Sequence, residues 1–225
     1  MQGRLLGSLL LLGSSSWALA QATLEVRTDQ PCNLVVNGSP QGQLSAGVPI
    51  TLQTGAGAQW IECSTAAGKA RRELTVAADS HSVVVLRASL IGRFRDQGNG
   101  IIADQKTGFQ WTASDNAGDI GWAAADRYCR ELDLAGPGWR LPTVAELEQI
   151  YDGSGTLTVP CQDLRCEVDP AFRLTGSWYW SSDLSDEDAS LAWYLAFHQA
   201  GRGSASLSAE QTGRALCVRP PPPPR

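Results

Sequence analysis

The chain has few histidines, no strongly basic stretch and, after its first twenty residues, no long apolar run. Only two histidines, His81 and His198, occur among 225 residues, too few for the paired spacings of a zinc site. Eighteen basic against 23 acidic side chains give a formal net charge of −5. Because an arginine-rich helix is also lacking, nucleic acid is not expected as the main partner. No later run approaches the roughly eighteen apolar residues of a membrane-spanning helix, so we expect no transmembrane segment in the mature chain.

The start of the chain has the pattern of a secretory signal peptide. Arg4 precedes the apolar run 5–12, and Ala18 and Ala20 are small residues at the two positions that a signal peptidase reads. We therefore predict a signal peptide over residues 1–20, cleaved near Ala20. The mature protein would then be periplasmic, secreted or on the cell surface.

Six cysteines follow this segment, an even number that predicts disulfides in an oxidising compartment. Cys32 and Cys63 lie on separate candidate strands and are each other's only local partners. We predict a Cys32–Cys63 bridge that cross-links a small β-sandwich. It would contribute about 3–4 kcal/mol through loop-closure entropy.

Residues 21–88 alternate apolar and polar side chains in short runs typical of β-strands, and Asn37-Gly38 is a hairpin-turn signal. The segment resembles the PEGA family of small β-sandwich repeats. The resemblance is carried by Leu24-Glu25-Val26, Val35-Val36-Asn37-Gly38, Val48-Pro49 and Val83-Val84-Val85-Leu86. It implies a spacer or binding module associated with a cell surface, although the cysteine pair departs from the usual pattern of that family.

Two short amphipathic helices with a sharp turn between them are predicted in residues 121–152. In the first, apolar residues recur at three- and four-residue spacing, and the Gly-Pro-Gly sequence at 136–138 ends it. The second begins at Thr143 with Glu146 three residues later, which is the pattern of a capping box. Its predicted buried face consists of Val144, Leu147 and Ile150.

Turn residues and oxygen donors occur together just after the first unit. The Asn-Gly pair at 99–100 and the Thr-Gly pair at 107–108 predict two reversals between three short strands. A calcium loop beginning at Asp96 would need glycine in its sixth position and glutamate in its twelfth. The chain has Ile101 and Thr107 there, so we interpret the pattern as turns.

The large aromatic residues of the second half are expected mainly in its core, because such side chains dominate the cores of small domains. Trp178, Trp180 and Trp193 lie on candidate strands. For these three we predict core packing in preference to stacking on a sugar ring.

Many ordered motifs in the second half together resemble the Lcl C-terminal domain family. They are Arg93-Phe-x-Asp-x-Gly-Asn-Gly, Asp104-x-x-Thr-Gly, Trp111, Trp122, Ala125, Tyr128-Cys129, Trp139-Arg140-Leu141-Pro142-Thr143, Glu146-Leu147, Trp180-Ser181-Ser182, Ala192-Trp193-Tyr194 and Cys217-Val218-Arg219. The resemblance implies a C-type-lectin-like fold over residues 89–220, an α+β domain with two short helices and an antiparallel sheet. The all-β unit 21–88 would precede it, and a proline-rich tail, 221–225, would follow.

The resemblance also implies how the other cysteines pair. In such folds a cysteine of the first helix is bridged to one on the last strand, which implies a Cys129–Cys217 disulfide. Closing so long a loop would contribute about 4–5 kcal/mol. Cys161 and Cys166 are then left to pair locally, which would contribute about 2 kcal/mol.

Candidate ligand-binding residues lie towards the end of the chain. Alternation along residues 192–198 places Tyr194 and His198 on the face opposite Trp193, Leu195 and Phe197. With Gln199 and Arg202, they are the preferred candidates for a surface site.

An acidic loop, 183–188, begins with a further candidate, Asp183. Calcium-dependent lectins place oxygen ligands in a comparable loop, but the Glu-Pro-Asn, Gln-Pro-Asp and Trp-Asn-Asp triplets of those lectins are absent. Because a run of charge is usually a solvated face, we predict no metal and no cofactor, with calcium in this loop as the alternative.

Three functions remain open on the sequence. The preferred one is a non-catalytic binding or adaptor protein of the bacterial cell envelope, whose lectin-like head recognises an envelope protein or a glycan. The second is an oxidase related to the formylglycine-generating enzymes, because Cys161 and Cys166 have the five-residue spacing of their cysteine pair. No histidine or lysine stands close to these cysteines in sequence to activate a thiolate. The third is a structural subunit of a surface or secretion assembly.

Overall fold

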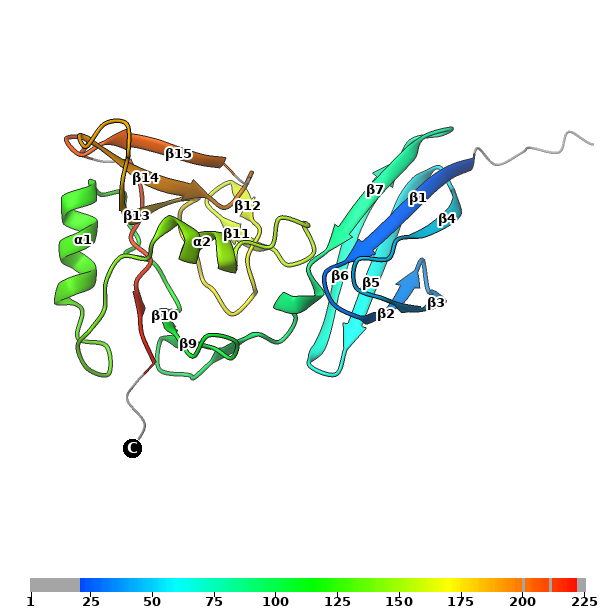
Figure 1. The fold of residues 1–225 in the computed structure, drawn as a ribbon, viewed down its shortest axis with the longest axis horizontal. Coiled ribbons are helices and arrows are strands. Elements are labelled where there is room, and N and C mark those ends of the chain that lie inside the picture. The colour runs from blue at the N-terminus through cyan, green and yellow to red at the C-terminus, as the bar shows by residue number, and fades with distance from the viewer. Residues whose placement is uncertain (1–20, 200, 211, 222–225) are drawn as a thin grey trace, which may run out of the picture.

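The computed structural model describes residues 21–199, 201–210 and 212–221. The predicted signal peptide, 1–20, lies outside the described residues, as do residues 222–225 of the predicted tail. The chain builds two units side by side along the long axis of the molecule, joined by a short connection (Figure 1). None of the described helices is long and apolar enough to cross a membrane.

The first unit consists of two β-sheets that face each other. Its strands are β1 (Gln21–Thr28), β2 (Cys32–Val36), β3 (Ser39–Leu44), β4 (Ile50–Gly55), β5 (Gly57–Thr65), β6 (Gly68–Val76) and β7 (His81–Leu86). One sheet has the order β4-β1-β7 and the other β3-β2-β5-β6. Leu24 and Val26 of the first sheet share a buried cluster with Leu34 and Ile61 of the second. Alternation along these strands therefore supplies the core that the sequence predicts.

The Cys32–Cys63 disulfide is present but does not join the two sheets. Cys32 lies on β2 and Cys63 on β5, and these strands are antiparallel neighbours in one sheet. The prediction that this bridge cross-links the sandwich is therefore wrong. It failed because strand order in a sheet depends on which distant segments pair, which local alternation does not encode.

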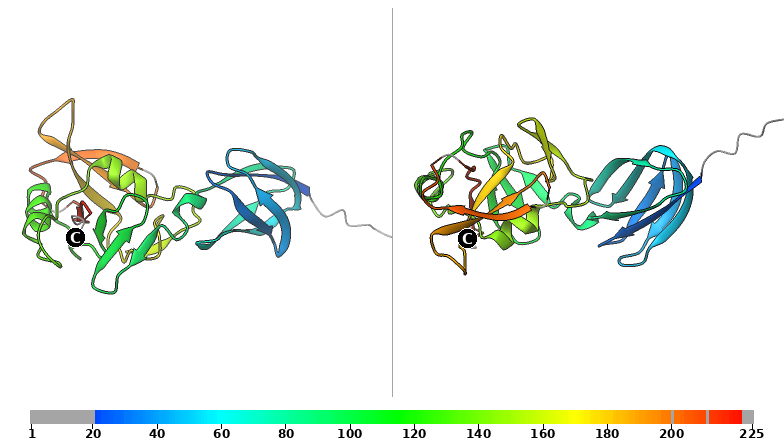
Figure 2. Two further views of the ribbon diagram at one scale, coloured as in Figure 1. Left: turned by 60° about the horizontal axis from the view of Figure 1, so that its bottom comes forward. Right: turned by 90° about the horizontal axis from the view of Figure 1, so that it is seen from above.

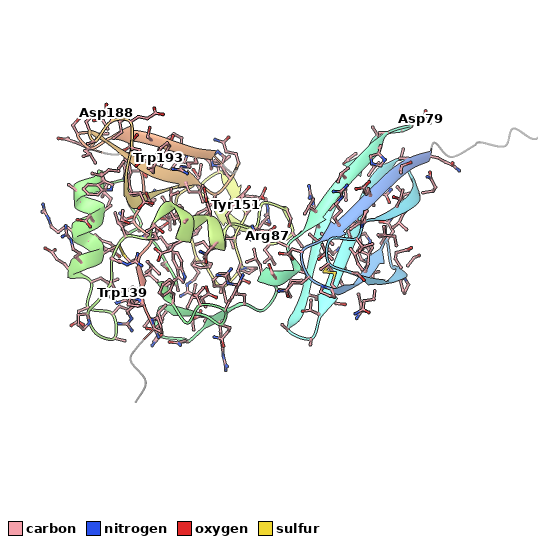
Figure 3. The ribbon with its side chains drawn as sticks, in the orientation of Figure 1. Asp79, Arg87, Trp139, Tyr151, Asp188 and Trp193 are labelled. Atoms are coloured by element: carbon pink, nitrogen blue, oxygen red, sulfur yellow. A yellow bond between two sulfur atoms is a disulfide. The ribbon has the colours of Figure 1, made fainter. Side chains whose placement is uncertain are left out.

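The connection between the units is packed. It contains the short helix η1 (Ala88–Leu90), in which Leu90 is fully buried. Gly92 has a φ of 69°, and a Cβ there would lie 2.7 Å from Ala67 in the β5–β6 turn. The turn thus lies directly on the connection. On the other side, Arg87 Nη1 donates to the Tyr151 carbonyl at 2.9 Å, and Figure 3 shows the two residues close together there.

The second unit is mainly β, with two short helices. Its elements are β8 (Phe94–Asp96), β9 (Ile101–Asp104), β10 (Gln110–Thr112), α1 (Trp122–Glu131), α2 (Val144–Ile150), β11 (Val159–Cys161), β12 (Leu164–Cys166), β13 (Trp178–Leu184), β14 (Leu191–Ala196), β15 (Gly201–Ser206) and β16 (Val218–Arg219). The sheets have the orders β16-β10-β9-β8, β13-β14-β15 and β11-β12. The α+β class is confirmed. The three-stranded sheet lies along the top of the unit in Figure 1, and Figure 2 shows the molecule from two further sides.

Both predicted helices are present. Helix α2 begins with the predicted capping box, in which Thr143 Oγ1 accepts from Glu146 N at 3.1 Å and Glu146 Oε2 accepts from Thr143 N at 2.7 Å. Val144, Leu147 and Ile150 are buried as predicted. Helix α1 is more exposed and buries only Ala125 and Cys129.

Strands β8, β9 and β10 confirm the turn interpretation of the segment that follows the connection. Asp104 accepts from Arg93 Nε at 2.7 Å and Nη2 at 2.6 Å, and also from Lys106 N and Thr107 Oγ1. Both carboxylate oxygens are therefore occupied by protein donors. Asp96 accepts from Gly98 N in the first turn.

The remaining two disulfides are the predicted pairs. Cys129 on α1 is bonded to Cys217, which precedes β16, and Cys161 on β11 is bonded to Cys166 on β12. No cysteine of the chain is free. Since disulfides persist in oxidising compartments, they indicate an extracytoplasmic protein.

Candidate functional site

The predicted site residues lie in three different places. Asp183, near the end of β13, accepts from Val144 N at 2.8 Å and so satisfies the first turn of α2. Tyr194 lies on β14, and Arg202 on β15. His198 and Gln199 follow β14 in a turn. Because the strand ends at Ala196, alternation no longer relates Tyr194 to His198.

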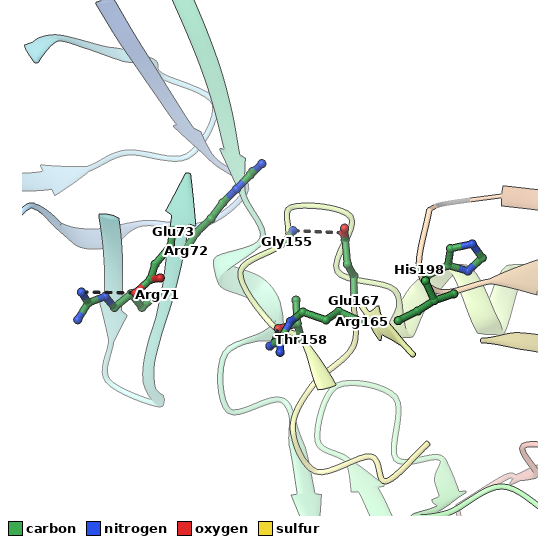
Figure 4. Close-up of a pocket in the computed structure, with 9 residues that line it drawn as sticks. Arg71, Arg72, Glu73, Gly155, Thr158, Arg165, Glu167 and His198 are labelled. Carbon is green, nitrogen blue, oxygen red and sulfur yellow. Dashed lines mark hydrogen bonds and ion pairs between the residues drawn. The ribbon is translucent and has the colours of Figure 1, made fainter. Parts of the chain in front are cut away.

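His198 lines a cleft of about 770 Å3 between the two units (Figure 4). The first unit contributes part of β6, and the second contributes the β11–β12 hairpin, the loop before it and His198. The lining residues are Arg71, Arg72, Glu73, Gly155, Thr158, Leu164, Arg165, Glu167 and His198. A cleft built by two units is a common place for a ligand site.

Two arginines of the cleft carry positive charge without a carboxylate partner. Within the described parts of the chain, neither Arg72 nor Arg165 forms a salt bridge. Arg165 donates to Thr158 Oγ1 instead, and Arg72 reaches towards the loop that contains Gly155 (Figure 4). The third arginine, Arg71, is engaged, because its guanidinium stacks 3.8 Å above the Trp60 ring. Glu73, which pairs with Arg71, and Glu167 also line the cleft. The lining thus has three positive and two negative side chains, and it presents one guanidinium without an ion pair from each unit.

Glu167 links Tyr151 to the loop that contains Gly155. Its Oε2 accepts from Tyr151 Oη and from Gly155 N, both at 3.2 Å. Burial, followed by the negative charge of Glu167, raises the pKa of Tyr151 to about 12. On the far side of the cleft, His198 Nδ1 is buried and has no hydrogen-bond partner among the described residues. The His198 ring therefore lines the cleft, while its Nδ1 faces the protein interior.

A second, smaller hollow contains a tryptophan that the sequence places in the core. Trp178 is 38% exposed, and its ring stacks on Tyr194 with centroids 4.6 Å apart and planes 13° apart. The core prediction is thus wrong for Trp178. It is correct for Trp180, which is 1% exposed in a cluster with Ala125 and Cys129 of α1. Alternation along β13 puts Trp178 and Trp180 on the same face of the strand. It does not reveal that α1 covers this face at Trp180 but not at Trp178.

The hollow beside Trp178 has a volume of about 210 Å3 and is mostly polar. Its lining residues are Asp119, Gln162, Ser177, Trp178 and Thr212. None of these belongs to the predicted site, which included only the neighbouring Tyr194. A usable signal in the sequence was the position of Trp178 at the first residue of its strand, directly after the polar Ser177.

On the opposite face of β14, Arg202 covers the ring of Trp193. Arg202 lies 4.1 Å above the Trp193 ring. Trp193 is only partly buried and belongs to neither buried cluster, so the core prediction is wrong for it as well. The contact of Arg202 with the ring stabilises both side chains on the sheet. The guanidinium of Arg202 thus has a partner, and it does not face Tyr194.

The acidic loop uses some of its carboxylates internally. Asp188 Oδ1 accepts from the backbone and side chain of Ser190, and these hydrogen bonds lower the pKa of Asp188. Figure 3 shows Asp188 at the outer edge of the unit. Within the described residues, no group of three or more histidine, cysteine, aspartate or glutamate side chains is placed to hold a metal ion.

Comparison with known proteins concerns the second unit. The sequence profile of the Lcl C-terminal domain matches residues 100–219, which is more than half of the chain. No curated protein matches the chain.

Proposed function

Because the chain belongs to the Lcl C-terminal domain family, we propose that it is a non-catalytic binding or adaptor protein of the bacterial cell envelope. Membership of this family indicates a surface or binding type of protein. The three disulfides support a location in the periplasm or on the cell surface. The lectin-like head is proposed to act as the recognition unit and the β-sandwich as a spacer that also contributes to the site.

The observation that carries this proposal is the cleft between the units, with Arg72 on one wall and Arg165 on the other. Guanidinium groups bind carboxylates through two parallel hydrogen bonds. Two of them on facing walls favour a segment that carries several acidic side chains. The net charge of the chain is −5, so this cationic cleft differs in sign from the molecule as a whole. The proposed ligand is therefore an acidic segment of an envelope protein.

Charge reversal at both arginines tests the proposal. The wild-type protein, the variant Arg72→Glu with Arg165→Glu, and Arg130→Glu would each be immobilised and exposed to envelope extract. Arg130 is the matched control, because it is exposed on α1 and its ion pair with Asp126 lies outside the cleft. We expect the wild type and the control to retain the same acidic protein and the double variant to lose it. Retention by the double variant would contradict the proposal.

The salt dependence of binding distinguishes a partner held by ion pairs from one held by an apolar interface. Partly exposed ion pairs weaken as the screening length falls from about 10 Å at 0.1 M salt to about 3 Å at 1 M. The retained protein should therefore elute as salt is raised. A structural subunit held by a large apolar interface would stay bound at high salt and would be insensitive to the arginine substitutions.

The absence of catalysis is also part of the proposal, and the state of Cys161 and Cys166 supports it. The two are bonded to each other and are 1% and 0% exposed, whereas a cysteine oxidase needs an accessible thiolate. Titration of the native protein with a thiol reagent should find no reactive thiol. A rapidly reacting pair at these positions would favour the oxidase instead.

A further inference from the structure

The hollow beside Trp178 is assembled from four separate segments that backbone hydrogen bonds hold together. Ile120 N donates to Gly213 O at 2.8 Å, which fixes the loop of Asp119 against the segment of Thr212. Arg214 N donates to Trp178 O at 2.9 Å, which fixes that segment against β13. The walls of the hollow are thus preformed, and a ligand would not have to order them.

The β11–β12 hairpin adds a further wall and is itself closed by a disulfide. Cys161 and Cys166 are bonded, and Cys166 Sγ lies 3.6 Å from Gly176 O, immediately before Ser177. Gln162 follows Cys161 with a φ of 52°, a conformation that is uncommon for a residue other than glycine. The covalently closed hairpin holds Gln162 at the hollow in this conformation.

One wall is an aromatic surface that is supported from behind. Tyr194 stacks on Trp178, and Tyr194 in turn lies across Gly203 of β15, where a Cβ would overlap its phenol ring. Tyr194 thus supports one side of the Trp178 ring, and 38% of Trp178 is exposed. Such a fixed aromatic surface is suited to an apolar face of a ligand.

The other walls offer hydrogen bonds of both kinds. Asp119 accepts, whereas Gln162, Ser177 and Thr212 can both donate and accept. Asp119 Oδ1 lies 2.9 Å from Arg214 Nε, yet the carboxylate side chain is 48% exposed. Arg214 is only 7% exposed, and neither its Nε nor its Nη1 has a partner with hydrogen-bond geometry in the described residues, so its contact with Asp119 is an ion pair. Asp119 is thus ion-paired to Arg214 through Oδ1, and the exposed part of its carboxylate can accept a hydrogen bond from a ligand.

Charge and size restrict the ligand. Among the described residues that line the hollow, only Asp119 is charged, and Arg214 compensates that charge, so the lining favours a neutral, hydrogen-bonding ligand. The volume of about 210 Å3 is less than a third of that of the cleft, which suits a single ring better than a peptide segment. A sugar ring has an apolar C–H face and a rim of hydroxyl groups, each of which donates and accepts.

We propose that the hollow beside Trp178 binds one ring of a neutral saccharide, which stacks on Trp178 and bonds through its hydroxyl groups to Asp119 and Gln162. This site is distinct from the cleft in both residues and ligand chemistry. The head would then hold a glycan at the hollow and an acidic protein segment at the cleft.

Indole N–H resonances of the protein test this site with neutral tetrasaccharides of hexoses and of N-acetylhexosamines as probes. The Trp178 signal is assigned by its loss in Trp178→Ala. At least one probe should shift this signal saturably. Isothermal titration calorimetry with that probe should show that Trp178→Ala and Asp119→Ala each weaken its binding by about tenfold, the effect of losing one stacking or charged hydrogen-bonding partner. Trp193→Ala, on the opposite face of β14, should bind as the wild type does.

Several results would overturn the site. They are no shift of the Trp178 signal with any probe, equal affinity in Trp178→Ala, or an equal loss in Trp193→Ala. Saturation of the hollow by a neutral peptide in place of the saccharides would also overturn it. The cleft variant, Arg72→Glu with Arg165→Glu, should bind the saccharide normally, so failure of the protein-binding proposal and failure of this one are distinguishable.

Discussion

Buried carboxylates fix the loops on which the two sites depend. Asp115 accepts from Thr175 N at 2.7 Å, Thr175 Oγ1 at 2.6 Å and Tyr179 Oη at 2.7 Å, and so fixes the segment that leads into Trp178. Burial and the charge of Asp115 raise the pKa of Tyr179, so this tyrosine remains a neutral donor. Next to the connection between the units, Asp104 likewise fixes a loop, because it accepts two hydrogen bonds from Arg93. Such groups stabilise only when every donor and acceptor is paired.

Asp104 gives a pH-dependent prediction. Burial alone would raise its pKa, but hydrogen bonds from Arg93, Thr107 and Lys106 outweigh burial and lower it. Because the pKa is lower in the folded than in the unfolded state, this contribution is present above the unfolded pKa, about 3.9, and is lost as pH falls through the folded value. We expect the free energy of unfolding to fall between about pH 5 and pH 2.

Asp104→Asn provides the comparison, with urea unfolding measured across this pH range. At pH 7 the variant should be less stable by about 3–5 kcal/mol, because Arg93 keeps a buried charge without its partner. Below pH 4 the difference from the wild type should shrink. A constant difference at all pH values would show that the ionisation of Asp104 does not contribute.

Among whole elements, α2 depends most clearly on local sequence. Thr143→Ala removes the side-chain acceptor of the capping box and should cost about 1 kcal/mol in chemical unfolding. The control is Thr75→Ala, an exposed threonine of β6, which should change stability by at most about 0.5 kcal/mol. Equal effects of the two substitutions would mean that the cap contributes nothing to stability.

The disulfides of the second unit should differ in their contributions. Cys129 and Cys217 are separated by 88 residues and Cys161 and Cys166 by five. In the loop-entropy description, losing the first bridge costs about 4–5 kcal/mol and losing the second about 2 kcal/mol. Paired alanine substitutions, compared by urea unfolding under oxidising conditions, should therefore show the larger loss for Cys129 and Cys217. The reverse order would contradict this account.

Elements specified by neighbours in sequence were predictable, and surfaces formed by distant segments were not. The capping box at Thr143, the turns at 99–100 and 107–108 and the buried face of α2 follow from local spacing. The exposure of Trp178 depends on how far α1 extends over β13. The hollow beside it needs residues from four segments, and no local pattern brings Asp119 and Gln162 together.

At the scale of the whole molecule, the cleft arises because the connection places β6 against the β11–β12 hairpin. Arg72 follows Lys69 and Arg71 in sequence, whereas Arg165 stands alone among neutral and acidic residues. Because the two arginines are far apart in the chain, the sequence did not show that they face one cleft. His198 was selected as a candidate and does line the cleft, although the reason given, a shared face with Tyr194, does not hold. The packing of Ala67 on Gly92 and the Arg87–Tyr151 hydrogen bond keep the two walls in place.

Site-specific photo-crosslinking in intact envelopes tests the recognition cleft most directly. A photoreactive amino acid would replace Thr158, which lines the cleft, or Glu131 at the end of α1 as the control. We predict an adduct from position 158 whose attachment site maps to an acidic segment of an envelope protein, and its loss when Arg72 and Arg165 are changed to glutamate. No adduct from position 158, or the same adducts from position 131, would contradict the assignment of the cleft as the recognition site.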